Sequence, residues 1–169
     1  MRASPVVVVG TGPAGLAAAL ALGRMGVGAV VAGPLPQPDL LAADTRTAAL
    51  FGPSVVLMSR LGAWAAMAQS AEPILGLRLI DDTGGLLRAP DALFTARQIG
   101  RDAFGANIAN AAIVQALYAQ ARAEPAITFS GANVAALRPA EACVAVELET
   151  GATLSASLVV GADGRASPS

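Results

Sequence analysis

The spacing of hydrophobic residues changes character twice within the first 32 positions. Residues 5–9 read PVVVV, a short β-branched run typical of a strand that is buried on both faces. Residues 13–26 read PAGLAAALALGRMG, a run rich in alanine and leucine that opens on proline and closes on glycine, as helices do. A second apolar run, VGAVVA, follows at 27–32. This order predicts a strand, a tight turn, a helix and a second strand.

The pattern then continues as a mixture of helices and short strands. Pro53 can open a helix that Gly62 closes, and two extended runs within 74–96, separated by the turn-forming residues 82–85, predict an antiparallel hairpin. Apolar residues return at helical spacing in 110–123. Four strand-like segments follow, at 126–130, 132–138, 143–149 and 152–160.

Composition excludes several kinds of function. The 169 residues carry a net charge of −1 and are 14% charged, so no basic surface is available to bind nucleic acid, and we expect none as a partner. The chain has no histidine, which removes Ser/His/Asp and Cys/His catalysis and the commonest metal ligand; no metal site is predicted. The single Cys143 lies in an alternating apolar run, where it is expected to be a small buried residue of a strand.

Residues 6–26 could also be interpreted as a signal peptide or a membrane anchor. This stretch is apolar apart from Arg24 and contains small residues near a position where a signal peptidase could cut. Gly10, Gly12, Pro13 and Gly15 interrupt it, however, where a signal peptide or a spanning helix would prefer leucine. The strand, turn and helix are the favoured interpretation, and a secreted or anchored protein without enzymatic activity is kept as the alternative.

The glycines of that turn have the spacing G-x-G-x-x-G. Gly10 permits the tight turn, Gly12 lets the backbone approach a diphosphate, and Gly15 lets the helix lie close to the strand. Pro13 and Ala14 begin the helix, whose free N–H groups and positive dipole end attract an anion. The pattern extends through the residues Ala19, Leu22 and Gly26. It predicts a dinucleotide site, with either FAD or NAD as the ligand.

One part of the usual dinucleotide site is absent. An Asp or Glu at the end of the second strand normally binds the adenosine ribose, but this position falls at Ala32 or Gly33. Asp39 and Asp44 are the next acidic residues and could reach the ribose only if the intervening loop folds back.

Arg46 has two interpretations. It can pair with Asp44 on the surface, or it can bind phosphate oxygens in two-pronged fashion from a loop just before a helix. The sequence alone does not favour either interpretation over the other.

Four motifs in order resemble a known family. VVVVGTGPAGLAAALAL, DTRTAALFGPSVVLMSRLGAW, the helix that begins at Asn110, and LVVGADGRAS are similar to the ubiquinone-biosynthesis FAD hydroxylases of the UbiH/UbiF type. These are group A flavoprotein monooxygenases, like para-hydroxybenzoate hydroxylase. The resemblance implies an α/β fold: a Rossmann-like FAD-binding βαβ domain with inserted antiparallel strands of a substrate domain.

The resemblance also implies roles for individual residues. Gly10, Gly12 and Gly15 would hold the FAD diphosphate together with Pro13 and Ala14. Arg46 would reach the phosphate region, and Asn110 would meet the ribityl chain, although asparagine is also a common helix N-cap. Val134 would lie beside the adenine through its backbone. Asp163 and Gly164 would contribute to FAD and NAD(P)H binding, although Asp-Gly after a strand is also an ordinary turn. No catalytic side chain is assigned.

For the activity, the resemblance implies that NAD(P)H reduces FAD and that one atom of dioxygen is transferred to an aromatic ring. The substrate would be a small aromatic molecule, prenylated in the case of a ubiquinone precursor. Such a substrate implies a cytoplasmic enzyme with peripheral contact with the inner membrane. An NAD-dependent Rossmann dehydrogenase or reductase is the enzymatic alternative.

The same resemblance divides the chain and sets its extent. Residues 1–73 would form the FAD-binding βαβ part, 74–105 an inserted hairpin of the substrate domain, and 106–169 the return to the FAD-binding domain. The family's third motif, Gly-Asp-Ala, is not found in the sequence. We therefore expect an N-terminal portion of a longer hydroxylase, inactive and poorly soluble by itself.

Overall fold

A computed structural model describes residues 6–84 and 88–164. At its centre lies a parallel sheet in the strand order β12-β1-β2-β8. Its strands are β1 (Val6–Val9), β2 (Ala29–Ala32), β8 (Ile127–Phe129) and β12 (Leu158–Gly161). The predicted strand, turn, helix and strand at the start of the chain are confirmed.

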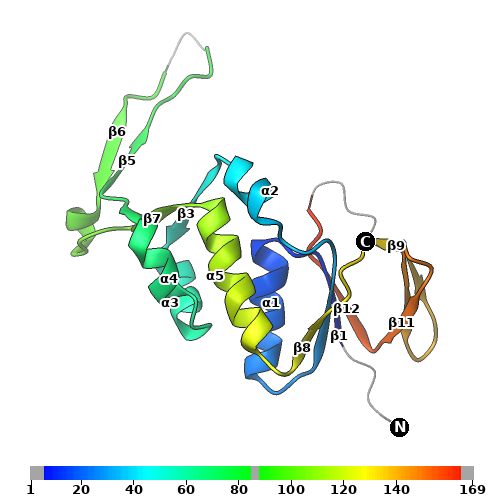
Figure 1. Cartoon of the computed structure of the whole chain (residues 1–169). Coiled ribbons are helices and arrows are strands. Elements are labelled where there is room, and N and C mark those ends of the chain that lie inside the picture. Colours follow the sequence, from blue (N-terminus) through cyan, green and yellow to red (C-terminus); the bar gives the residue numbers. More distant parts are fainter. Residues whose placement is uncertain (1–5, 85–87, 165–169) are drawn as a thin grey trace.

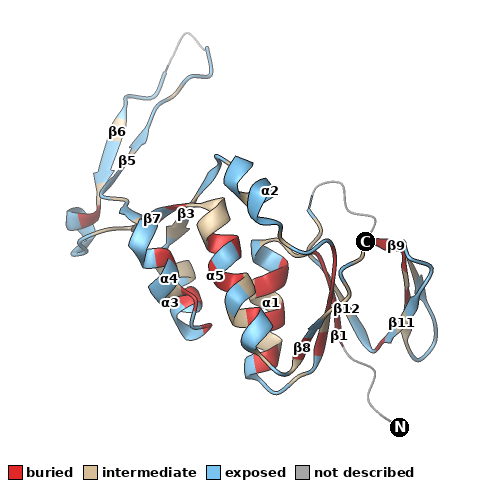
Figure 2. Cartoon of the chain, viewed as in Figure 1, coloured by how far each residue is buried: buried red, intermediate tan, exposed pale blue. Residues whose placement is uncertain are grey.

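The faces of this sheet are covered by different layers (Figure 1). The helices α1 (Pro13–Arg24) and α5 (Asn110–Ala123) cover one face. A three-stranded antiparallel sheet covers the other and consists of β9 (Val134–Pro139), β10 (Val144–Leu148) and β11 (Thr153–Ala156). Because both faces are covered, the two inner strands β1 and β2 are almost wholly buried, as Figure 2 shows, whereas the edge strands β8 and β12 are partly exposed.

The four valines of β1 reflect this three-layer arrangement. Successive strand residues point to opposite faces. Val8 accordingly packs in the helix-side cluster, whereas Val7 and Val9 pack in the cluster beneath the antiparallel sheet. A strand that touches a core on each side has no polar position, which is why it reads as an uninterrupted apolar run.

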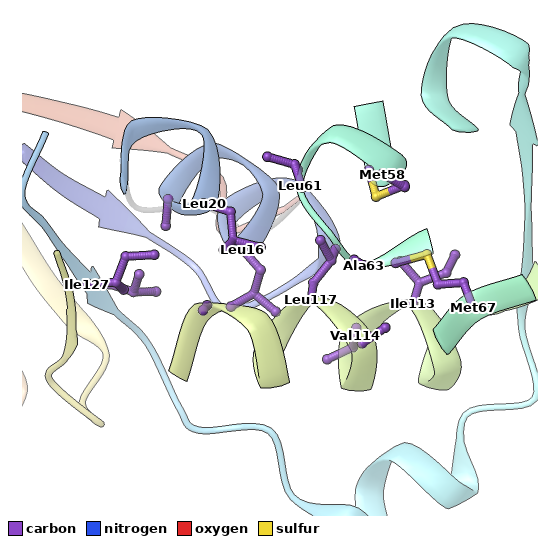
Figure 3. Packing of buried hydrophobic residues seen from close by; sticks show 14 of the residues in the cluster. Leu16, Leu20, Met58, Leu61, Ala63, Met67, Ile113, Val114, Leu117 and Ile127 are labelled. Atoms are coloured by element: carbon purple, nitrogen blue, oxygen red, sulfur yellow. The ribbon is translucent and has the colours of Figure 1, made fainter. Parts of the chain in front are cut away.

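The helix-side core lies between α1, α5 and a smaller helical layer (Figure 3). Leu16 and Leu20 of α1 and Leu117 of α5 are fully buried there. The smaller layer adds Met58 and Met67 to this core from the elements α3 (Gly52–Arg60) and α4 (Trp64–Met67). The helix expected after Pro53 is therefore confirmed, and Gly62 follows its end with a positive φ of 79°.

Between β2 and α5 the chain leaves the central sheet. This excursion contains α2 (Pro38–Ala43), β3 (Thr47–Phe51), the short helix η1 (Ala68–Ser70), β4 (Glu72–Pro73), η2 (Ala96–Ile99) and β7 (Gly105–Ala109). The strand order β3-β7-β4 forms a small antiparallel sheet that the hydrophobic pattern did not predict. β3 and β7 are separated by 53 residues in the sequence, so no local signal indicates their pairing.

The predicted hairpin is formed by β5 (Gly76–Leu79) and β6 (Ala92–Thr95), which pair antiparallel. It projects from the rest of the molecule (Figure 1). Its turn includes Gly84, which has a positive φ of 74°; the expected turn residue Gly85 lies outside the described residues.

Two strand expectations need correction. The segment 152–160 is not one strand but two, because β11 ends at Ala156 in the antiparallel sheet and β12 begins at Leu158 in the parallel sheet. Cys143 lies just before β10 and is only half-buried, so it is not the buried strand residue that the alternation indicated.

Candidate nucleotide-binding site

A pocket of about 960 Å³ opens at the carboxyl ends of β1, β2 and β12. Val9, Ala32 and Gly161 are neighbours in the register of these parallel strands, so the turns that follow the strands converge at one edge. Ligands of open α/β sheets bind at such edges. The residues lining this pocket are Val9 to Ala14, Ala32 to Pro34, Asn133 to Ala135, Glu149, and Ala162 to Gly164.

The glycine turn forms one wall of the pocket. Gly10 has a φ of 114°, and a β-carbon there would lie 2.3 Å from the carbonyl oxygen of Ala162. A β-carbon at Gly15 would lie 2.1 Å from the carbonyl oxygen of Gly10. Only glycine fits at either position, for different reasons: Gly10 allows the turn to pass β12, and Gly15 allows α1 to begin against the turn. Both expected roles agree with the geometry.

Gly12 differs from these two glycines. Its φ of −76° and ψ of 179° are open to any residue, and a β-carbon there would have nothing within 4 Å. Gly12 nevertheless lines the pocket. A β-carbon at this position would therefore take up space in the pocket without contacting other parts of the protein, which is the arrangement that a closely approaching diphosphate requires.

The start of α1 supplies the positive potential of the pocket. Gly12 is the N-cap and Pro13 the first helical residue, and among the described residues no side chain caps the helix and no acidic residue lies in its first turn. The first N–H groups of a helix have no partner within the helix. No lysine or arginine appears among the described lining residues, so an anion would be bound by backbone amides and the helix dipole.

The opposite side of the pocket comes from β9 and β12. Val134 begins β9 and is 6% exposed. Asp163 and Gly164 follow β12, and Gly164 has a φ of 89°, so the Asp-Gly pair forms a turn at the pocket. The structure thus brings together seven of the predicted residues, namely Gly10, Gly12, Pro13, Ala14, Val134, Asp163 and Gly164.

Arg46 and Asn110 are not among the lining residues but meet each other elsewhere. The register of β3 and β7 pairs Thr47 with Ala109, and the next residues outward are Arg46 and Asn110. The backbone N–H of Asn110 donates to the carbonyl oxygen of Arg46 at 2.9 Å. Arg46 precedes a strand, not a helix as the sequence indicated.

Asp44 joins Arg46 and Asn110 in a cluster outside the pocket lining. Nε and Nη2 of Arg46 donate to its two carboxylate oxygens, each at 2.8 Å, and the backbone N–H of Arg46 donates to Oδ1 at 3.0 Å. Hydrogen bonds from the side chain and then from the backbone N–H of Arg46, with a smaller contribution from Asn110, lower the pKa of Asp44 from 3.8 to about 2. The surface pairing of Arg46 with Asp44, one of its two interpretations, is therefore present.

Asn110 is not the helix N-cap that its residue type suggested. Ala109 occupies the N-cap position with extended backbone angles, and Asn110 is the first helical residue. Its side chain interacts with Asp44 instead of capping α5, because strand β7 continues directly into the helix.

Sequence reasoning missed several lining residues, among them Thr11, Asn133 and Glu149. Thr11 Oγ1 donates to the carbonyl oxygen of Pro34 at 2.6 Å, which ties the glycine turn to the loop after β2. Asn133 precedes β9 and Glu149 follows β10, strands of a different sheet, so only the fold shows that they reach the pocket. Neither Asp39 nor Asp44 is among the lining residues.

Comparison with known proteins agrees with this geometry. Residues 3–169 match the family model described as an FAD binding domain. The chain belongs to this FAD-binding domain family. The match favours FAD over NAD as the dinucleotide, and it favours the strand, turn and helix over a signal peptide for residues 6–26. No helix in the described parts of the chain is both long and apolar enough to cross a bilayer.

A curated relative is ubiquinone hydroxylase UbiL of Rhodospirillum rubrum, 34% identical over 169 residues that cover 98% of this chain. The chain spans 38% of that protein's length. Among solved structures, AlpK is 27% identical with a TM-score of 0.77, covering 98% of this chain and 32% of AlpK. The p-nitrophenol 4-monooxygenase PnpA of Pseudomonas putida is 24% identical with a TM-score of 0.72, covering 96% of this chain and 40% of that protein.

Proposed function

We propose that this chain is the FAD-binding portion of an aromatic-ring hydroxylase that uses NAD(P)H and dioxygen. The observation that carries the proposal is the open space at Gly12, beside the uncapped start of α1, in a pocket of about 960 Å³. That volume is at the upper end of the range typical of cofactor sites. The residues of the pocket therefore fit an extended dinucleotide.

In this proposal the backbone of the chain does most of the binding. The backbone N–H groups that begin α1, at Gly12, Ala14 and Gly15, hold the diphosphate. Pro13 fixes the backbone of the first helical turn and has no N–H group that would need a partner there. The backbone of Val134 lies beside the adenine. The turn at Asp163 and Gly164 closes the pocket and contributes to the approach of FAD and NAD(P)H.

Arg46 and Asn110 would act at a second point along FAD. Arg46 is exposed over 79% of its side chain, so its guanidinium could exchange Asp44 for a phosphate oxygen, and Asn110 would meet the ribityl chain. When bound, FAD supplies the electron transfer and oxygen transfer, while the protein supplies position and exclusion of water.

The substrate proposal rests on the relative. UbiL is a ubiquinone hydroxylase by name, and 98% of the present chain matches it. We propose a prenylated aromatic precursor of ubiquinone as the substrate of the whole protein. A substrate with such an apolar tail would be met at a membrane surface, which suggests a cytoplasmic protein that contacts the inner membrane peripherally. We also propose that the chain is divided as expected, with residues 1–73 and 106–169 in the FAD-binding part and residues 74–105 in the substrate domain.

The FAD part of the proposal is tested by substitution at Gly12. Gly12→Val would fill the space needed by the diphosphate, and we expect it to raise the Kd for FAD at least tenfold, measured by quenching of flavin fluorescence. Gly28→Val is the matched control, because Gly28 also has ordinary backbone angles and almost empty surroundings but is not among the pocket residues. Equal FAD affinity in the two variants, or no FAD binding by the unsubstituted chain, would contradict the proposal.

The hydroxylase part is tested on the whole protein with a prenylated phenol and isotopically labelled dioxygen. We expect the protein to show flavin absorbance at about 450 nm, to lose it anaerobically on addition of NADH or NADPH, and to give a product that contains one labelled oxygen atom. A product oxygen that comes from water would refute oxygen transfer from dioxygen.

A further inference from the structure

The end of β2 lacks the acid that normally binds the adenosine ribose, and the structure disfavours an acid at either position there. Ala32 is completely buried, in the same cluster as Val134 and Leu148. Gly33 has a φ of 155°, and a β-carbon there would lie 3.3 Å from the methyl group of Thr11 and 3.4 Å from its backbone nitrogen. An Asp or Glu at position 33 would therefore be strained and crowded.

A carboxylate reaches the same pocket from the antiparallel sheet. Glu149 follows Leu148, the last residue of β10, and lines the pocket together with Ala32 and Gly33. Since Leu148 is buried in the cluster that contains Ala32, the end of β10 lies against the layer in which β2 ends. Glu149 thus lines the pocket from the turn after β10, more than one hundred residues after the end of β2, where the acid normally lies.

A β-bulge lies where β9 begins and β10 ends, immediately before Glu149. The register pairs Glu147 with Ala136 but Leu148 with Val134, so Ala135 is an extra residue in β9. Bulges redirect side chains at sheet edges and beside binding sites. The backbone N–H of Glu149 donates to the carbonyl oxygen of Asn133 at 3.0 Å, which fixes the chain just beyond the bulge.

Asn133 also holds the carboxylate itself. Its side-chain amide donates to Oε2 of Glu149 at 3.0 Å. A carboxylate has about four acceptor positions. The single hydrogen bond from the Asn133 amide therefore leaves Glu149 able to accept hydrogen bonds from further donors. The two hydroxyls of a ribose are such donors, and they are neutral, which makes them better partners for a carboxylate than the diphosphate is.

We propose that Glu149 accepts hydrogen bonds from the adenosine ribose hydroxyls of FAD, in place of the absent acid at the end of β2, and that Asn133 positions it. This inference rests on the proposed FAD site. Glu149 is a binding residue for the ribose, and Asn133 acts through Glu149.

The test measures selectivity for the ribose. The chain is loaded with FAD, and FAD is displaced by ADP or by 2′,3′-dideoxy-ADP, which lacks both hydroxyls. We expect the unsubstituted chain to prefer ADP about tenfold, because hydrogen bonds to a charged group are worth at least that much. Glu149→Ala should reduce the preference to about twofold or less, and Asn133→Ala should reduce it partly.

Glu147→Ala is the matched control. Glu147 lies two residues earlier, within β10, and pairs with Arg138, and it is not among the pocket residues. We expect it to keep the full preference. Melting curves of all variants show whether each is folded, and Glu149 is exposed, so its truncation should leave the melting temperature within a few degrees of the original.

The other outcomes separate this inference from the function on which it rests. If the unsubstituted chain does not bind FAD, the proposed FAD site itself fails. If it binds FAD but Glu149→Ala keeps the preference for ADP, or weakens ADP and its dideoxy analogue equally, the assignment of Glu149 fails alone. If Glu149→Ala alters the choice between ADP and inosine diphosphate instead, Glu149 contacts the base, and the ribose assignment is overturned.

Discussion

Gly10 and Ala162 approach each other more closely than any side chain would permit. A β-carbon at Gly10 would lie 2.3 Å from the carbonyl oxygen of Ala162 and 2.6 Å from its carbonyl carbon. The backbone N–H of Ala162 donates to the carbonyl oxygen of Val9 at 2.8 Å, so the two strands cannot separate without breaking a sheet bond. This contact joins the glycine turn after β1 to the Asp-Gly turn after β12.

We therefore expect Gly10→Ala to lower the free energy of unfolding by about 3 kcal/mol, from the left-handed φ together with the contact with β12. Gly151→Ala is the control, because Gly151 also has a positive φ of 84° but has nothing within 4 Å of a β-carbon. It should cost only about 1 kcal/mol. Urea denaturation measures both. Equal losses would mean that the contact with Ala162 contributes nothing.

The cluster of Asp44, Arg46 and Asn110 predicts an unusual acid titration. The side-chain hydrogen bond from Arg46 lowers the pKa of Asp44 from 3.8 to about 2. Arg46→Met should return this pKa toward 3.8, as measured by carbon-13 NMR of the carboxyl group. Arg60→Met, which changes an arginine of α3 outside the cluster, should leave it at about 2. A pKa that stays at about 2 in Arg46→Met would show that Arg46 is not the cause.

The lowered pKa of Asp44 also determines how the stability of the fold changes with pH. Because the folded-state pKa is below the unfolded value, the ionised pair stabilises the fold fully above about pH 4 and loses this contribution as the pH falls through about 2. The difference in acid stability between the original chain and Arg46→Met should therefore be present at neutral pH and vanish in strong acid. A difference that grows below pH 2 would have the wrong sign.

The helix-side core predicts a large effect of truncation at Leu117. This side chain is completely buried between α5 and α1 (Figure 3). Leu117→Ala should cost about 2–5 kcal/mol of unfolding free energy, since the lost contacts leave a cavity. Leu40→Ala is the control, because Leu40 is 67% exposed and its truncation should change stability by less than about 0.5 kcal/mol. Thermal or urea unfolding distinguishes the two.

The projecting hairpin predicts self-association. Its strands carry exposed apolar side chains, including Leu79 at 61% and Leu93 at 63% exposure, and a two-stranded sheet has open edges that can pair with another chain. Leu79→Lys and Leu93→Lys should each reduce light scattering of concentrated protein. Gln69→Lys adds the same charge at another exposed position without removing apolar surface. If it reduces scattering equally, net charge and not the hairpin controls association.

The parts of the fold that the sequence predicted are those with local causes. The glycine spacing predicted the turn between β1 and α1, because a positive φ at Gly10 and a close approach at Gly15 are requirements of single positions. The helix after Asn110 and the hairpin within 74–96 followed from periodicity and turn residues. Each of these signals lies within about twenty residues of the structure that it predicts.

What the sequence did not predict depends on distant partners. The segment at 105–109 contains glycine and asparagine and has no strand pattern, yet it pairs with residues 47–51. Ser157 divides an apparently continuous strand because its two halves join different sheets. Such choices are made by the layer against which a segment packs, which local periodicity does not encode.

For the site, the sequence by itself determined the glycine turn and the first helix, because backbone conformation there is dictated by glycine and proline. Tertiary structure alone decided which side chains meet around that turn. It brought Asn133 and Glu149 into the pocket from the antiparallel sheet and placed Arg46 and Asn110 together outside the pocket lining. The reason is physical: conformational freedom belongs to each residue, whereas proximity across 100 residues arises only when separate strands and helices bury their apolar faces together.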